Sequence, residues 1–124
     1  MDPLADTLTR IRNAILASHS AVLVPHSKAK LHLLEVLVAN KFLTEVKEIK
    51  TGKFPEIEIK LIPGKKLSLR KISKPGRRIY RQVPEIKPVL AGLGIGVYFT
   101  SAGILTDREA RAKKVGGELI CEVW

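Results

Sequence analysis

Three consecutive stretches in which apolar and polar residues alternate constrain the fold of this chain more than any other feature. They read FLTEVKEI, FPEIEIKLI and KLSLRKI, and the turn-forming segments KTGK and PGKK separate them. Alternation with a period of two places one set of side chains on each face of a strand. The pattern therefore predicts a meander of three antiparallel strands, each with one face towards water.

Two amphipathic helices are expected before these strands. DPLADTLTRIRNA carries apolar residues at helical spacing, and Asp2 followed by Pro3 is typical of a helix start. HSKAKLHLLEVLVANKF has a broad apolar face, with Ser27 as the expected N-cap. The short run AVLVP between them is expected to be a strand. These patterns predict an N-terminal α/β lobe, with two helices packed on a three-stranded antiparallel sheet.

The C-terminal part is expected to be rich in strands. GIGVYFT and ELICEVW contain β-branched and aromatic residues or alternate apolar with polar ones, which is typical of strands. The segment TDREARAKK between them is expected to form one short helix. Thr106 and Glu109 form a capping box, and Gly116-Gly117 is expected to end the helix. The connection KPGRRIYRQVPEIKPVLAGLG is rich in proline and glycine. The sequence thus predicts an α+β fold of two small lobes, residues 1–73 and 74–124.

Charge indicates the kind of partner. The chain has 22 Lys and Arg against 12 Asp and Glu, a formal net charge of +10. Six of these basic residues fall in RKISKPGRRIYR, which contains no acid and holds Tyr80 beside a Pro-Gly turn. A cation next to an aromatic ring suits the phosphates and bases of RNA. The alternative is that the run is only a solvated face.

Lys28 and Lys30 stand in the first turn of the expected second helix, where the helix dipole disfavours cations. An anion docked at that helix start would be held by free N–H groups and both ammonium groups. Surface lysines that simply tolerate the dipole are the alternative.

Metal, cofactor and catalytic chemistry find no support in the sequence. His19, His26 and His32 have no cysteine or carboxylate at metal-ligand spacing. GLGIG runs into a strand-like segment, whereas a dinucleotide loop opens a helix. No motif pairs an acid with a base, so no catalytic residue is expected. The single Cys121 is expected to pack as an apolar group, and the lack of a leader or membrane span favours the cytoplasm.

The segment Thr100-Ser101-Ala102-Gly103 raises a further expectation of binding. Its two hydroxyls can each donate and accept a hydrogen bond, and Gly103 allows a ligand to approach the main chain closely. Such a loop can recognise RNA shape and 2′-hydroxyls. An ordinary Ser/Gly hairpin is the alternative.

Several motifs together resemble one family. KPGRRIY, GLGIG, TSAGILTDREAR and VGGELICEVW, in this order, resemble the C-terminal half of bacterial small-subunit ribosomal protein eight, and DPLADTLTRIRNA and SKAK resemble its N-terminal half. The resemblance implies a structural ribosomal protein without catalysis, located in the small subunit in the cytoplasm. It implies a primary binder of an irregular helix in the central domain of small-subunit ribosomal RNA, and a role in assembling the subunit for translation. Neighbouring ribosomal proteins are implied partners, and the messenger RNA of its own operon is a partner that the sequence leaves open.

The resemblance also assigns roles to residues. The Thr-Ser-x-Gly turn would enter a distorted minor groove, Tyr80 would pack against RNA, and Glu118 would accept hydrogen bonds from an unpaired base. The family usually has Ser and Lys where this chain has Phe99 and Ala102, so Phe99 either stacks on a base or turns into the core. The expected RNA-binding residues are Lys28, Lys30, Lys74, Arg77, Tyr80, Thr100, Ser101, Gly103, Gly117 and Glu118.

Two other function classes are kept as rivals. A basic protein-interaction module would show no preference among RNAs at about 0.15 M salt, because non-specific binding is already weak at that salt concentration. A small RNA hydrolase would turn RNA over.

Overall fold

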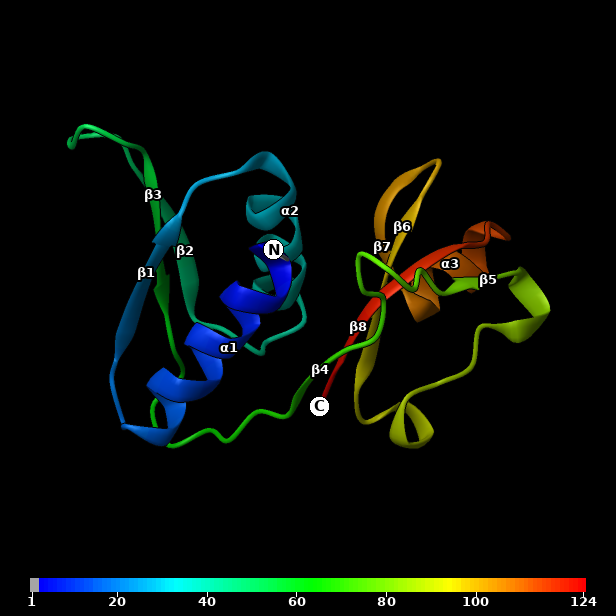
Figure 1. Cartoon of the computed structure of the whole chain (residues 1–124). Coiled ribbons are helices and arrows are strands. Elements are labelled where there is room, and N and C mark those ends of the chain that lie inside the picture. Colours follow the sequence, from blue (N-terminus) through cyan, green and yellow to red (C-terminus); the bar gives the residue numbers. More distant parts are fainter. Residues whose placement is uncertain (1–2) are drawn as a thin grey trace. The chain divides into compact units, whose positions relative to one another are not determined.

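The computed structural model describes residues 3–124, so the expected N-cap Asp2 lies outside the described residues. The described chain divides into two compact units, residues 3–67 and 68–124 (Figure 1). The first unit contains α1 (Pro3–Leu16), β1 (Ala21–Pro25), α2 (Lys28–Ala39), β2 (Glu45–Ile49) and β3 (Glu56–Lys60). The second contains β4 (Leu69–Lys71), β5 (Tyr80–Arg81), β6 (Ile95–Thr100), β7 (Gly103–Thr106), α3 (Asp107–Lys113) and β8 (Gly117–Val123), with the short 3₁₀ helices η1 (Val83–Glu85) and η2 (Leu90–Gly92).

The N-terminal unit is a three-stranded antiparallel sheet covered by two helices, as the sequence predicts. The strand order is β1-β3-β2, so β3 is central, and both helices lie on the same side of the sheet (Figure 1). Alternation along β3 buries Ile57 and Ile59 completely. The helices contribute Leu8, Ile11, Leu33, Leu34 and Leu37 to the core.

The membership of that sheet differs from the expected meander. KLSLRKI does not join it, because β4 pairs with β8 in the C-terminal unit, with Leu69 opposite Val123. The strand from AVLVP takes the third place and pairs with β3. Both Leu69 and Val123 are buried, so this pairing completes the C-terminal core. The second unit accordingly begins at Ser68, earlier than the expected boundary after residue 73.

The helix starts that the structure describes follow the predicted chemistry. Ser27 is the N-cap of α2, and its Oγ accepts a hydrogen bond from the N–H of Lys30 at 3.2 Å. Thr106 and Glu109 form the predicted capping box of α3, with reciprocal hydrogen bonds of 3.2 and 3.0 Å. The end of α3 is different, because Lys114 in the left-handed conformation caps it instead of Gly116-Gly117.

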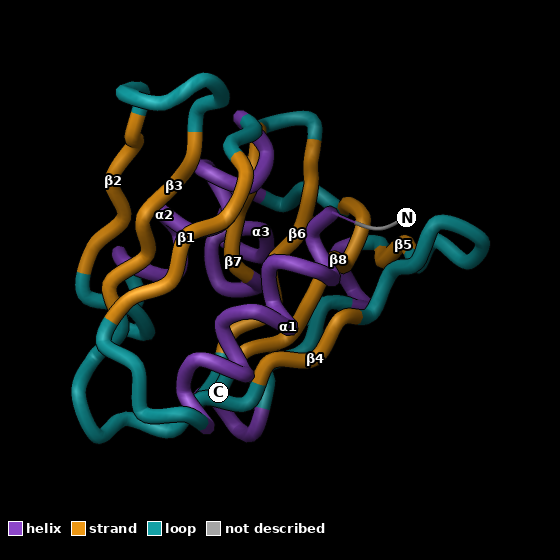
Figure 2. The backbone as a smooth tube through the Cα atoms, turned by 60° about the vertical axis from the view of Figure 1, so that its left-hand side comes forward, coloured by secondary structure: helices purple, strands orange, loops and turns teal. Residues whose placement is uncertain are grey.

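The C-terminal unit is built around β8. The strand β6 lies along one edge of β8, while β4 and β5 pair with the two ends of its other edge, and β7 extends the sheet beyond β6 (Figure 2). A bulge shifts the register between Val97 and Tyr98, so that β8 contributes one extra residue there. The helix α3 packs Ala110 against Tyr98, Leu105 and Leu119. The core of this unit therefore lies between the sheet and α3.

Two buried polar residues support this unit. Asp107 accepts a hydrogen bond from the N–H of Gly96 at 3.0 Å and one from Arg111 at 2.9 Å, so it ties β6 to α3. Cys121 is completely buried, as predicted, and burial raises the pKa of its thiol to about 12. The thiol is therefore protonated and unreactive at neutral pH.

The helices between residues 3 and 124 are all too short or too polar to cross a bilayer.

Candidate nucleic-acid interface

The strand register brings several of the predicted site residues together at the start of β8. Tyr80 in β5 lies opposite Glu118, and Glu118 lies opposite Phe99 in β6. Residues that face each other across antiparallel strands project from the same side of the sheet. Tyr80, Glu118 and Phe99 therefore share one face, with the acidic residue between the two aromatic ones.

The two aromatic residues differ in how far they reach water. The Tyr80 side chain is 69% exposed, which leaves its ring available to a ligand. Phe99 is half-buried, so it is neither a fully buried core residue nor a free stacking platform. The register places it beside Glu118, at the border between the core and the surface.

Gly116 and Gly117 allow this close approach of strands. A Cβ atom on Gly117 would lie 2.4 Å from the carbonyl oxygen of Phe99, and one on Gly116 would lie 2.6 Å from that of Arg81. Both distances are shorter than any real contact, so a side chain at either position would push β5 or β6 away from β8. The glycines thus serve to bring Tyr80 and the β6–β7 hairpin to the same end of β8.

The β6–β7 hairpin has a two-residue loop, Ser101-Ala102, because Thr100 pairs with Gly103. The Thr100 hydroxyl donates a hydrogen bond to the Gly103 carbonyl at 2.7 Å and accepts one from the Ala102 N–H at 3.1 Å. Ser101 is exposed, and within residues 3–124 its hydroxyl makes no hydrogen bond in the structure. The two hydroxyls therefore differ: Thr100 shapes the turn, and Ser101 faces outwards.

Gly103 completes the loop with a φ of +108°, in the range that side chains rarely adopt. Gly103 therefore supplies a backbone conformation that a residue with a side chain would adopt only with strain.

Glu118 is held in place by an ion pair with Arg78 that no local sequence pattern indicates. Arg78 Nη1 lies 3.2 Å from Glu118 Oε2, and the Glu118 side chain is only 13% exposed. The described contacts engage Oε2, which leaves Oε1 as an acceptor for a ligand. Arg78 belongs to the basic run that the sequence singles out, but nothing local to it indicates a partner 40 residues away.

The basic run folds into a second hairpin. Lys74 and Arg77 exchange backbone hydrogen bonds of 3.0 and 2.9 Å around the Pro75-Gly76 turn, and both side chains are exposed. The buried Ser73 anchors this turn, because its Oγ accepts a hydrogen bond from the N–H of Ile79 at 2.9 Å. Ile79 in turn accepts a hydrogen bond from the Leu119 N–H at 2.9 Å. The cationic turn is thus fixed to β8 on the same edge as Tyr80.

The two lysines of α2, in the N-terminal unit, have different positions. Lys28 is exposed at the first residue of the helix. Lys30 is only 6% exposed, and its ammonium group donates a hydrogen bond to the Pro25 carbonyl at 3.1 Å. The expectation that both lysines present a free ammonium group is therefore corrected for Lys30, because its side chain folds back onto the end of β1.

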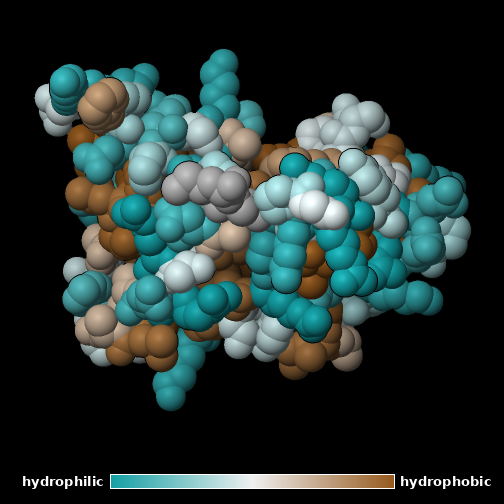
Figure 3. All heavy atoms as spheres, in the orientation of Figure 1, coloured by the Kyte–Doolittle hydropathy of each residue, from teal (hydrophilic) through white to brown (hydrophobic). Residues whose placement is uncertain are grey.

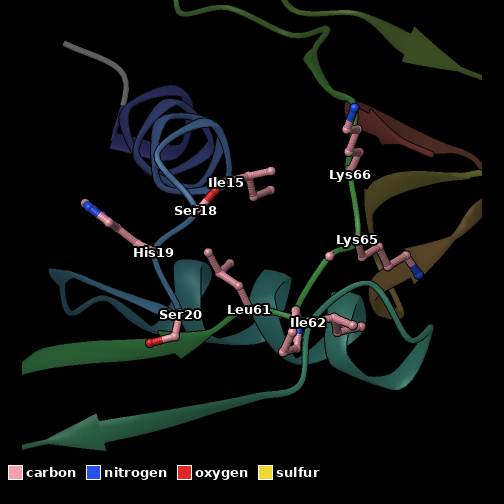
Figure 4. Close-up of a pocket in the computed structure, with 10 residues that line it drawn as sticks. Ile15, Ser18, His19, Ser20, Leu61, Ile62, Lys65 and Lys66 are labelled. Carbon is pink, nitrogen blue, oxygen red and sulfur yellow. The ribbon is translucent and has the colours of Figure 1, made fainter.

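A hollow of about 290 Å³ lies in the N-terminal unit at the end of α1, but it does not resemble a reaction site (Figure 4). Its lining, which lies wholly within the described residues, is mostly apolar and includes no carboxylate. The Lys65 ammonium donates to the Lys41 carbonyl at 2.6 Å, and the Lys66 and Lys65 side chains extend in different directions. The described residues also contain no cluster of three metal-binding side chains.

Comparisons with known proteins agree with the motifs of the sequence. The family described as ribosomal protein S8 matches residues 2–124. Proteins named small ribosomal subunit protein uS8 are similar over nearly the whole chain. The one from Caldanaerobacter subterraneus is 48% identical, with 99% of this chain and 97% of the relative covered. The one from Rhodopirellula baltica is 47% identical over 98% and 97%, and the one from Leifsonia xyli is 42% identical over 99% and 97%.

A match of this extent does not arise from a shared basic composition, because it runs through both units and through every element that builds the surface around Glu118. The chain belongs to the ribosomal protein S8 family.

Proposed function

We propose that this protein is a structural component of the small ribosomal subunit and binds an irregular helix in the central domain of ribosomal RNA. The binding surface consists of Tyr80, Ser101, Glu118 and the Lys74–Arg77 turn. The observation that carries the proposal is the register of β5, β6 and β8, which gathers an exposed ring, an outward hydroxyl and a carboxylate oxygen at one end of the sheet. We refer to these residues below as the β8 surface.

Each part of the β8 surface suits a different feature of RNA. Lys74 and Arg77 neutralise phosphates, which contributes affinity that falls as salt is added. The exposed Tyr80 ring stacks on a base or packs on a ribose. The Ser101 hydroxyl pairs with a 2′-hydroxyl or a base edge, and Oε1 of Glu118 accepts from the amino group of an unpaired base. The β8 surface therefore prefers a distorted helix to a regular duplex, because a regular duplex does not expose an unpaired base.

The family supports this assignment over the rivals that the sequence left open. Its members are ribosomal proteins and not enzymes, as the sequence predicts, which disfavours the RNA hydrolase. Ribosomal proteins have RNA and other ribosomal proteins as partners, and in bacteria they work in the cytoplasm. The rival module without RNA preference does not explain an outward hydroxyl and a carboxylate beside an exposed ring.

Filter binding of a fragment of the irregular RNA helix at several salt concentrations tests the proposal. Lys74→Ala is expected to weaken binding and to lower the salt slope by about one unit, since one phosphate contact is lost. Ser101→Ala is expected to weaken binding of the irregular helix but not of a regular duplex, with the salt slope unchanged. Identical behaviour of both variants on both RNAs would contradict the division of roles.

A second RNA partner is proposed for the same surface. A messenger RNA from the protein's own operon would bind there if it folded into the same irregular shape, because the surface recognises shape and unpaired bases. Competition between that messenger RNA and the ribosomal fragment tests this, and the two RNAs should exclude each other on the wild-type protein.

A further inference from the structure

The loop that precedes β6 exposes apolar residues that are not part of the β8 surface and have no role in the proposed RNA binding. Residues 89–94 lie at the end of β6 opposite to the Ser101-Ala102 loop, so the six residues of the strand, about 20 Å, separate the two. Leu90 is 53% exposed and Leu93 is 82% exposed. Figure 3 shows apolar spheres at the lower end of the C-terminal unit, where this loop is drawn in Figure 1.

The sequence around these leucines is free of charge. Residues 88–106 contain no Asp, Glu, Lys or Arg, although charged residues make up 27% of the chain. Leu16, which is also strongly exposed, lies instead at the end of α1 between Arg12 and Asn13 on one side and Ser18 and His19 on the other. Two strongly exposed leucines three residues apart in one uncharged loop are more apolar exposure than an isolated surface residue provides, which makes this loop a candidate interaction surface.

The backbone of the loop is held in an unfavourable conformation. Leu90, Ala91 and Gly92 have φ values of +47°, +55° and +95°, so three successive residues lie in the left-handed region. Leucine and alanine rarely adopt this conformation, because the Cβ atom approaches the neighbouring carbonyl oxygen. Strain of this kind persists where the surrounding structure enforces it, and it concentrates at functional surfaces.

The surrounding structure does enforce it. The Val89 carbonyl accepts hydrogen bonds from the N–H groups of Gly92 and Gly94 at 3.0 and 3.1 Å, and Val89 is buried. A Cβ atom on Gly94 would lie 2.6 Å from the Val123 carbonyl oxygen, so the base of the loop presses on the end of β8. The two leucines are therefore displayed on a preformed support, which lowers the entropic cost of docking.

The chemistry of the loop favours a protein as its partner. RNA is bound through cations, hydrogen-bonding groups and aromatic rings, and the side chains of residues 88–94 supply none of these. A second copy of this chain is disfavoured, since each copy carries a net charge of +10. An apolar pocket on a different protein would bury both leucines without any unpaired polar group.

We propose that Leu90 and Leu93 dock into an apolar pocket of a neighbouring protein in the small ribosomal subunit. The proposal rests on the proposed function, which places the chain in that subunit, but it assigns a separate surface and a separate class of partner. The β8 surface holds RNA, and the leucine loop holds a protein.

Photochemical cross-linking in assembled small subunits tests the proposal. Benzoylphenylalanine is introduced in place of Leu93, and in a control chain in place of Leu16, which is similarly exposed at 79%. The Leu93 position is expected to give a cross-link to one ribosomal protein, identified by mass spectrometry, that the Leu16 position does not give. Cross-links only to RNA, only to a second copy of the chain, or to nothing would overturn the proposal.

A paired variant supplies a second measurement. The double change Leu90→Ser and Leu93→Ser is expected to leave the affinity for the naked RNA fragment within about twofold, because no RNA-binding group is removed. The double variant should dissociate from assembled subunits in a high-salt wash. The wild-type protein and the Leu16→Ser variant should stay bound to the subunits in the same wash. A weakened affinity for naked RNA would assign the loop to the RNA surface and overturn the proposal. Failure of the proposed function would appear separately, as unchanged RNA binding by Ser101→Ala.

Discussion

The guanidinium group of Arg78 lies 3.2 Å from the carboxylate of Glu118, so the acidic residue of the β8 surface is neutralised before any ligand arrives. An unpaired carboxylate would repel phosphates, and the basic residue removes that repulsion. The same contact restricts the position of the carboxylate. Glu118 lies between Tyr80 and Phe99 in the sheet, and its side chain is only 13% exposed. This arrangement explains how an acid can belong to a surface for which we propose a polyanionic ligand.

Glu118→Ala should weaken binding of the irregular RNA helix by at least about tenfold, because a hydrogen bond to a charged group contributes roughly 1.5–3 kcal/mol. Glu118→Gln keeps one acceptor oxygen and should lose less. Fluorescence anisotropy with a labelled fragment measures both. A regular duplex is the control RNA, and an equal loss on that duplex would show that Glu118 acts only through the fold.

Gly117→Ala should destabilise the C-terminal unit by about 1–3 kcal/mol, the usual cost of overpacking, because its Cβ atom would lie 2.4 Å from the Phe99 carbonyl oxygen. Gly76→Ala is the matched control, since nothing lies within 4 Å of the added atom. Trp124, the single tryptophan of the chain, reports on this unit during urea unfolding. A Gly117→Ala protein as stable as Gly76→Ala would contradict the close approach of β6 and β8.

Ionisation of the buried Cys121 thiol should lower the stability of the fold at alkaline pH. Burial raises the pKa of its thiol from 9.0 to about 12, so the unfolded chain releases this proton at a lower pH than the folded chain. The contribution of the thiol is fully present below pH 9.0 and is lost as the pH rises towards 12. At a pH midway between the two values the folded state should have lost about 2 kcal/mol relative to neutral pH.

Urea unfolding of wild type and Cys121→Ala at several alkaline pH values measures this effect. Tyrosines and lysines also titrate in this range, so the difference between the two proteins is the relevant quantity. That difference should change with pH in favour of the variant above pH 9.0. A constant difference would show that the thiol does not ionise differently in the two states.

Lys28 and Lys30 should respond differently to replacement by alanine. Lys30→Ala removes the hydrogen bond to the Pro25 carbonyl and should lower stability by about 1 kcal/mol, with the salt slope of RNA binding unchanged. Lys28→Ala should leave stability unchanged. The exposed Lys28 is expected to contact a phosphate, so its replacement should lower the salt slope by about one unit. Thermal unfolding and filter binding measure the two effects, and a salt-slope change for Lys30→Ala would mean that its ammonium group leaves Pro25 to bind RNA.

Local patterns in the sequence determined most of the elements and the family. The capping box of Thr106 and Glu109, the N-cap Ser27 and the alternation in β3 depend on residues a few positions apart, so each can be recognised without knowing the fold. The burial of Cys121 followed from the same kind of pattern. The motifs around the β6–β7 hairpin and around Gly117 were sufficient to indicate the ribosomal protein S8 family.

Contacts between distant residues were decided only by the tertiary structure. Alternation makes residues 69–71 a strand, but only the packing of Leu69 beside Val123 places that strand in the C-terminal sheet. The same holds for Arg78 on Glu118 and for the exposure of Leu93. Periodicity reports which face of an element is apolar, whereas the partner of that face depends on free energies summed over the whole chain.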